Sequence, residues 1–104
     1  MTHGFEREAF EEYLDTTRHY AEQREGLGEE FIQAVETAIA AIALEPTRYQ
    51  RADEGLRIFR MKRFPYHLFY RYNEADNHAT IFAVMHHRRR PNYWRDRLKA
   101  EDES

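Results

Sequence analysis

Apolar residues recur at intervals of three and four along the first part of the chain. From Ala9 onward the residues on this stripe are Phe10, Tyr13, Leu14, Tyr20 and Ala21, with Thr17 as a weak member. Acidic residues fill much of the opposite face, so the pattern predicts an amphipathic helix. Two glycines within three residues, in Gly26-Leu27-Gly28, predict the end of that helix.

A second stripe with the same spacing follows the glycines. Its members are Phe31, Ile32, Val35, Ala38, Ile39 and Ile42. We expect a second helix here, ended by Pro46. Because the break between the two helices is short, the sequence predicts an antiparallel helical hairpin whose apolar stripes face the rest of the chain.

The second half of the chain has the composition of β-strands. Aromatic and branched residues fill segments 56–64, 66–72 and 80–86, and Asn73, Asp76 and Asn77 separate the last two. These segments predict an antiparallel meander, with Pro65 between its first two strands. A short strand over residues 2–6 has only a weak signal.

Alternation along the middle segment assigns side chains to the two faces of the expected sheet. Tyr66, Leu68, Tyr70 and Tyr72 share one face, and His67, Phe69 and Arg71 share the other. We expect the first face to meet the helices and the second to stay open. By the same parity His86 shares a face with Phe82 and Val84, which favours a structural role for His86.

The chain ends in a segment of different character. Pro91 can open a short helix that continues to Leu98, and the charged residues 99–104 read as a frayed tail. The expected fold is therefore α+β. An N-terminal helical hairpin packs on a small antiparallel sheet, followed by a short C-terminal helix, in a single domain of residues 1–98.

Composition limits how this domain can be stabilised and in which cellular compartment we expect it. The 104 residues suffice for one core, and cysteine is absent, so neither disulfides nor thiolate metal sites can stabilise the fold. The N-terminus lacks the pattern of a signal peptide, and no apolar run approaches the roughly 20 residues needed to span a bilayer. The sequence predicts a soluble, cytoplasmic protein without a membrane partner.

Charge is divided unevenly along the chain. Residues 1–55 hold 5 Lys or Arg against 13 Asp or Glu, a net charge of −8, whereas residues 56–104 hold 11 against 6, a net charge of +5. The basic half includes a run from His86 to Arg97 that interleaves arginine with Tyr93 and Trp94. Arginine binds phosphate or carboxylate, and aromatic rings offer stacking faces, so this run predicts a contact surface for a macromolecule. We assign Trp94 mainly to packing.

The histidines suggest one specific chemistry. Cleavage of RNA by its own 2′-hydroxyl needs a base, an acid and cations on the phosphate. His67 and His87 can exchange protons near neutrality, and Arg57, Arg71 and Arg89 can supply the cations. Simple exposure of His67 and His87 stays open as the alternative.

Metal and cofactor sites find no support in the sequence. The adjacent His86 and His87 should point to opposite faces of a strand, and no His-Glu-x-x-His spacing accompanies them. A glycine-rich phosphate loop and a nucleophile elbow are also missing. We therefore expect neither a metal nor a cofactor.

The ordered motifs resemble those of the RelE/ParE family of bacterial toxins from type II toxin–antitoxin systems. The matching residues are Gly26-Leu27-Gly28 with Phe31, Leu44-Glu45-Pro46, Arg57, Arg63-Phe64-Pro65-Tyr66 with Leu68 and Tyr70, and Ala83-Val84 with His86, Arg89, Pro91, Tyr93, Trp94 and Arg97. The resemblance implies a cognate antitoxin that covers the active surface. RelE-like members cut messenger RNA on the ribosome, whereas ParE-like members inhibit DNA gyrase.

Two departures favour the ParE-like branch. RNA-cutting members usually carry an arginine in the middle strand, and this chain has His67 there. Ribosome-directed members also tend to be basic, whereas this chain has a net charge of −3. We expect a toxin that binds a protein target such as gyrase, through Arg57, Arg71, Arg88, Arg89 and Tyr93. The alternatives are a ribosome-dependent endoribonuclease and a non-toxic binding module; the sequence leaves the oligomeric state open.

Overall fold

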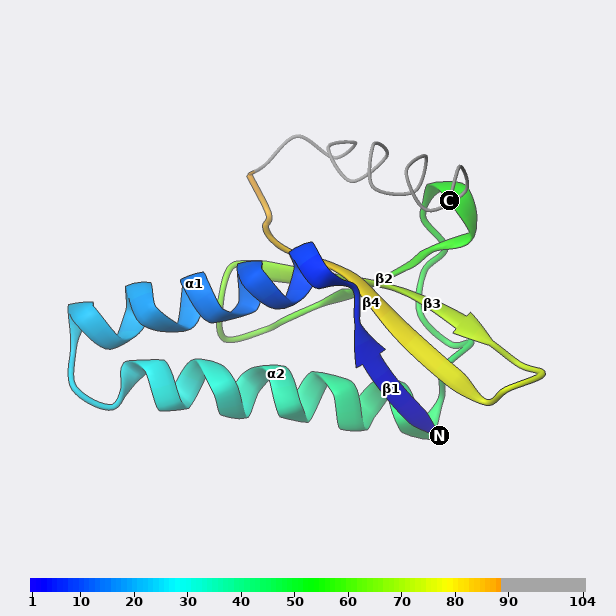
Figure 1. The fold of residues 1–104 in the computed structure, drawn as a ribbon, viewed down its shortest axis with the longest axis horizontal. Coiled ribbons are helices and arrows are strands. Elements are labelled where there is room, and N and C mark those ends of the chain that lie inside the picture. The colour runs from blue at the N-terminus through cyan, green and yellow to red at the C-terminus, as the bar shows by residue number, and fades with distance from the viewer. Residues whose placement is uncertain (89–104) are drawn as a thin grey trace.

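A computed structural model of the chain describes residues 1–88, and within them two helices pack on one face of a four-stranded sheet (Figure 1). The elements follow in the order β1 (Thr2–Phe5), α1 (Arg7–Gln23), α2 (Leu27–Leu44), the 3-10 turn η1 (Asp53–Gly55), β2 (Arg57–Arg60), β3 (Tyr66–Asn73) and β4 (His78–His86). This is the predicted α+β arrangement of a helical hairpin and a sheet. Neither helix in the described part combines the length and apolarity that crossing a membrane requires.

The helical hairpin forms as predicted, but its turn is tighter than the glycine pattern suggested. Glu6 caps α1 through its carboxylate, which accepts hydrogen bonds from the backbone N–H groups of Glu8 and Ala9 at 3.0 and 3.3 Å. Gly26 adopts the left-handed conformation, with φ of 84°, and α2 begins at the next residue. Gly28 therefore lies inside α2 rather than in the break.

Gly28 has a packing role in the hairpin. A Cβ atom built on it would lie 2.9 Å from Cβ of Ala21 and 3.0 Å from the carbonyl oxygen of Thr17, both on α1. Real Cβ atoms are almost never that close to a neighbour, so the lack of a side chain lets the two helices approach each other. The second glycine of the motif thus sets the distance between α1 and α2.

The sheet has the order β1-β4-β3-β2. Strands β2, β3 and β4 form the predicted antiparallel meander, although β2 is shorter than expected and ends at Arg60. The weakly signalled first strand exists as β1, which pairs with β4 in parallel and makes the sheet mixed. β1 pairs with β4 only as far as Ile81, so the edge of β4 beyond that residue has no neighbouring strand. There the backbone N–H of Val84 donates to the carboxylate of Glu12 on α1 at 3.1 Å, and α1 covers this edge.

A β-bulge changes the face assignment along β4. Phe69 lies opposite Ala83 and Tyr70 lies opposite Ile81, so Phe82 is an extra residue in β4. The bulge moves Phe82 into a cluster on the face away from the helices, while Val84 stays in the core under the helices. The expectation that His86 shares a face with Phe82 is therefore wrong, because simple alternation fails across the extra residue.

The core lies between the helices and the first sheet face. As predicted, Tyr66, Leu68, Tyr70 and Tyr72 all pack there, together with Phe31 and Val35 of α2. Phe31 is fully buried, and its ring centroid lies 5.2 to 6.1 Å from those of four aromatic residues, which are Phe64, Tyr20, Tyr66 and Tyr13. Such tilted and edge-to-face pairs are favourable geometries for aromatic rings.

The second sheet face is not the open surface that we expected. Its cluster consists of Leu56, Phe69, Phe82, Ala83 and Met85, each no more than 5% exposed. Burial on both faces is the reason that β4 reads as a nearly continuous apolar run. The expected C-terminal helix, the residues Arg89, Tyr93 and Trp94, and the tail lie outside the described residues.

Candidate functional site

Three histidines meet at one end of the sheet, where β3 begins and β4 ends. His67 lies opposite Met85, and the neighbouring pair joins Tyr66 to His86. The ring centroids of His67 and His87 are 6.4 Å apart, and the rings of His86 and His87 stack with centroids 4.6 Å apart. The structure thus brings together the two histidines that the sequence analysis paired and adds His86 beside them.

Hydrogen bonds to the backbone define which ring nitrogens carry protons. Nδ1 of His87 lies 3.1 Å from the carbonyl oxygen of Pro65, and because a carbonyl only accepts, Nδ1 must donate. The backbone N–H of His87 donates to the same oxygen at 2.9 Å. Nδ1 of His86 accepts from the backbone N–H of Arg88 at 3.1 Å, so His86 carries its proton on Nε2 and is neutral.

Electrostatics keep two of these rings uncharged near neutral pH. Burial lowers the pKa of His67, and Coulombic interactions with Arg60, His87 and His86 lower it further. Burial also lowers the pKa of His86, with added repulsion from His87 and Arg88. A neutral imidazole can accept a proton, but it places no positive charge on a phosphate.

Acidification should therefore destabilise the fold. The folded-state pKa values of His67 and His86 lie below the unfolded value of about 6.5. As pH falls through 6.5, these histidines become protonated in the unfolded chain before they do in the folded chain. The free energy of unfolding therefore decreases below that pH. Urea unfolding at steps between pH 7.5 and 5.5 measures this loss. The loss of stability should be smaller in the double variant His67→Gln/His86→Gln and unchanged in His19→Gln. An equal loss in the double variant and in His19→Gln contradicts the prediction.

The arginines proposed from the sequence lie in different places. Arg71 is on the same face as His67 but four residues further along β3, roughly 13 Å away along the strand. Its guanidinium donates to the carbonyl oxygen of Glu54 at 3.3 Å and lies 5.1 Å from the ring centroid of Phe82. Arg88 is exposed and directly follows the histidines.

Arg57 points to the other side of the sheet. It lies opposite Tyr70, which is part of the core under the helices, and cross-strand partners share a face. Its guanidinium donates to the carbonyl oxygen of Tyr49 at 2.9 Å. The structure therefore does not bring Arg57 to the histidines.

Arg60 is the cation that the sequence analysis missed. It lies directly opposite His67 across β2 and β3, and its guanidinium donates to the side-chain oxygen of Gln50 at 2.8 Å. Counting outward from Pro65 would have paired His67 with Arg63 instead, so the sequence did not give the register that places Arg60 there. Within residues 1–88, no group of three or more His, Asp or Glu side chains has the arrangement of a metal site.

Comparison with solved structures first defines the class of fold. The chain is similar to a solved structure of the "Chromosomal ParDE TA system from P. aeruginosa", with 15% sequence identity and a TM-score of 0.59. The alignment covers 83% of this chain and 95% of that chain. At this identity the similarity concerns the fold, which is the α+β fold of that protein. A comparison with curated proteins gave no match.

The family follows from the sequence itself. Residues 5–91 match the family described as the ParE toxin of type II toxin-antitoxin system, parDE. The match covers most of the chain, which therefore belongs to the ParE toxin family. The predicted resemblance to the RelE/ParE toxins, and to their ParE-like branch, is confirmed.

Proposed function

We propose that this chain is a toxin that acts in the cytoplasm by binding a protein target such as DNA gyrase, and that a cognate antitoxin neutralises it. Membership of the ParE toxin family supports the first part of the proposal. The antitoxin is supported by the structural neighbour, which is a ParDE toxin–antitoxin system.

One observation carries the choice of a protein target. Two of the cations proposed from the sequence, Arg57 and Arg71, do not lie beside the histidine pair. His67 stands where RNA-cutting relatives carry arginine, and the pKa of His67 is lowered, so the position holds a neutral ring at pH 7. Arg57 lies on the opposite sheet face, and Arg71 is held against Glu54 and Phe82. None of these three side chains gives a phosphorane-like transition state at the histidine pair a nearby positive charge.

A second candidate, a ribosome-dependent endoribonuclease, rests on the closeness of His67 and His87. Their ring centroids are 6.4 Å apart, a separation across which a base and an acid can flank one ribose-phosphate link. In this alternative His87, with Nδ1 bonded to Pro65, presents Nε2 for proton transfer, and Arg60, opposite His67, supplies a cation.

Expression of the chain alone in bacteria separates these functions. We expect growth arrest with intact transcripts and loss of supercoiling by gyrase. Transcript ends and gyrase supercoiling are measured in parallel on the wild type, on His87→Ala and on His19→Ala, whose altered residue lies on α1 and contacts Tyr20 and Gln23. Codon-phased transcript breaks that vanish only in His87→Ala contradict the proposal. Unaltered growth in a host with sensitive gyrase indicates a binding module instead.

Neutralisation has its own readout. We expect a short reading frame beside this gene to encode the antitoxin, and its co-expression should restore growth and yield a complex that is stable in size-exclusion chromatography. Failure of both results contradicts the antitoxin part of the proposal without bearing on the target.

A further inference from the structure

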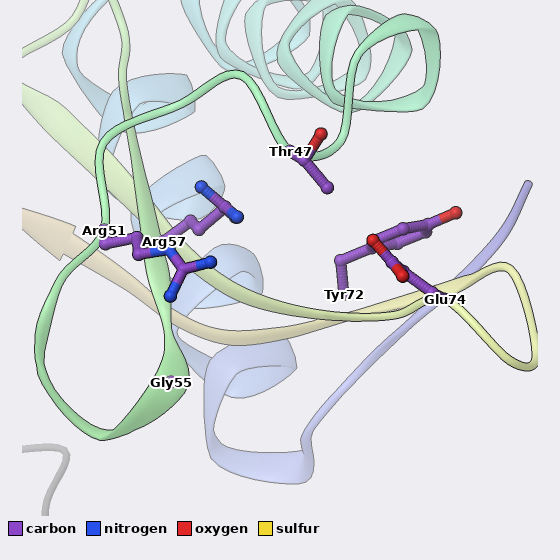
Figure 2. A pocket seen from close by; sticks show the side chains of 6 residues that line it. All are labelled: Thr47, Arg51, Gly55, Arg57, Tyr72 and Glu74. Carbon is purple, nitrogen blue, oxygen red and sulfur yellow. The ribbon is translucent and has the colours of Figure 1, made fainter.

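A small pocket lies on the side of the sheet away from His67. It has a volume of about 200 Å³ and is lined by Thr47, Arg51, Gly55, Arg57, Tyr72 and Glu74. These residues come from the loop after α2, the segment before β2, and the neighbouring ends of β2 and β3. In Figure 2 the two arginine side chains occupy one side of the pocket, and Tyr72 and Glu74 occupy the other.

The arginine wall is electrostatically unfavourable by itself. Arg51 and Arg57 form an isolated antiparallel bridge, so they lie directly opposite each other. Like charges in that position destabilise a sheet. Within residues 1–88 neither guanidinium forms an ion pair with a carboxylate. The single hydrogen bond identified for Arg57, to the carbonyl oxygen of Tyr49, leaves most of its five donors available. An anion between the two arginines would relieve the repulsion.

The rest of the pocket limits the kind of anion. Glu74 forms part of the opposite wall and brings a carboxylate to the pocket. A chain of phosphates such as RNA meets repulsion from the carboxylate of Glu74. A ligand with one negative charge, and with a hydrogen-bond donor towards Glu74, suits both walls.

We propose that this pocket binds a single carboxylate, held between Arg51 and Arg57, from a ligand that also carries an ammonium or amide donor facing Glu74. Planar guanidinium groups bind carboxylates through paired hydrogen bonds. The carboxylate belongs either to a peptide or to a free amino acid. The site is distinct from the histidine group, so it does not depend on which target the toxin has.

Nuclear magnetic resonance of the full 15N-labelled chain tests the site. The arginine Nε–Hε signals are followed during titration with free glutamate, with an acetylated and amidated peptide that contains one glutamate, and with inorganic phosphate. We expect millimolar binding of glutamate or of the peptide, and the tighter of the two identifies the source of the carboxylate. Shifts absent up to about 20 mM of either carboxylate, or tighter binding of phosphate, overturn the proposal.

Matched variants link binding to the pocket. Arg51→Gln should weaken carboxylate binding about tenfold or more, since it removes a charged hydrogen-bonding partner. Its unfolding midpoint without ligand should be equal to or above that of the wild type, because the like-charge pair is gone. Arg48→Gln, which alters an exposed arginine paired with Glu45, should bind as the wild type does. Equal affinity in Arg51→Gln and the wild type overturns the proposal.

Glu74→Gln provides a test of orientation that does not alter either arginine. It should weaken binding of free glutamate, whose ammonium loses its partner, and strengthen binding of inorganic phosphate, which no longer faces a carboxylate. Unchanged affinities for both probes overturn the proposed arrangement. Growth arrest by the wild-type toxin is measured separately, so failure of this site leaves the proposed target unaffected.

Discussion

Replacement of Phe31 by alanine is expected to destabilise the protein by about 3 to 5 kcal/mol. The side chain is fully buried at the point where α1, α2 and the sheet meet, and it contacts four aromatic rings. Since domains of this size are stable by about 5 to 15 kcal/mol, the variant should be near its unfolding threshold.

Urea unfolding followed by circular dichroism measures this effect. The matched control is Ile32→Ala, which removes an apolar side chain from the next position of α2, where 37% of the residue is exposed. That change should cost no more than about 1 kcal/mol. Similar losses in the two variants would contradict the assignment of Phe31 as the centre of the core. If Phe31→Ala is destabilised as expected, a loss of toxicity in that variant reflects unfolding rather than a damaged contact surface.

Replacement of Gly28 by valine is expected to have the second largest effect, about 2 to 3 kcal/mol of destabilisation. The new Cβ would lie 2.9 Å from that of Ala21 and 3.0 Å from the carbonyl oxygen of Thr17, so the helices must separate. Overpacking of this kind costs about 1 to 3 kcal/mol, and the branches of valine add to it. The better helix propensity of valine, worth only a few tenths of a kcal/mol over glycine, does not offset the clash.

Two further variants isolate the cause. Ala40→Val introduces the same side chain at an exposed position of α2 and should change stability by less than about 1 kcal/mol. Ala21→Gly removes the opposing methyl group, so the double variant Gly28→Val/Ala21→Gly should lose less than the two single losses added together. Strict additivity would mean that the clash with Ala21 is not the source of the effect.

These two sites differ in how visible they were in the sequence. Phe31 stands on a helical stripe, and its spacing to Val35 and Ile42 marks it as a core residue without any structure. Gly28 looked like a helix breaker because two glycines within three residues favour a turn. Only Gly26 has the positive φ that requires glycine, and the tight packing at Gly28 depends on residues of α1 that the local pattern cannot reveal.

The candidate site was also partly visible. The motif order indicated the histidines, and strand alternation placed His67, Phe69 and Arg71 on one face, where the structure has them. Arg57 was grouped with them by its charge and its place in the motif order, neither of which assigns it to a sheet face. Whether an arginine faces the helices or the opposite side depends on strand register, and a shift by one residue reverses every side chain.

The sequence by itself determined the helical hairpin, the antiparallel meander, the main core residues and the family, because each depends on local spacing or on ordered motifs. The tertiary structure alone decided the parallel pairing of β1, the bulge at Phe82, and the arginine pair at positions 51 and 57. These features arise from pairings between segments far apart in the chain. The free energy of each feature depends on strand register or on charges brought close together. Neither exists until the segments pair in the folded chain.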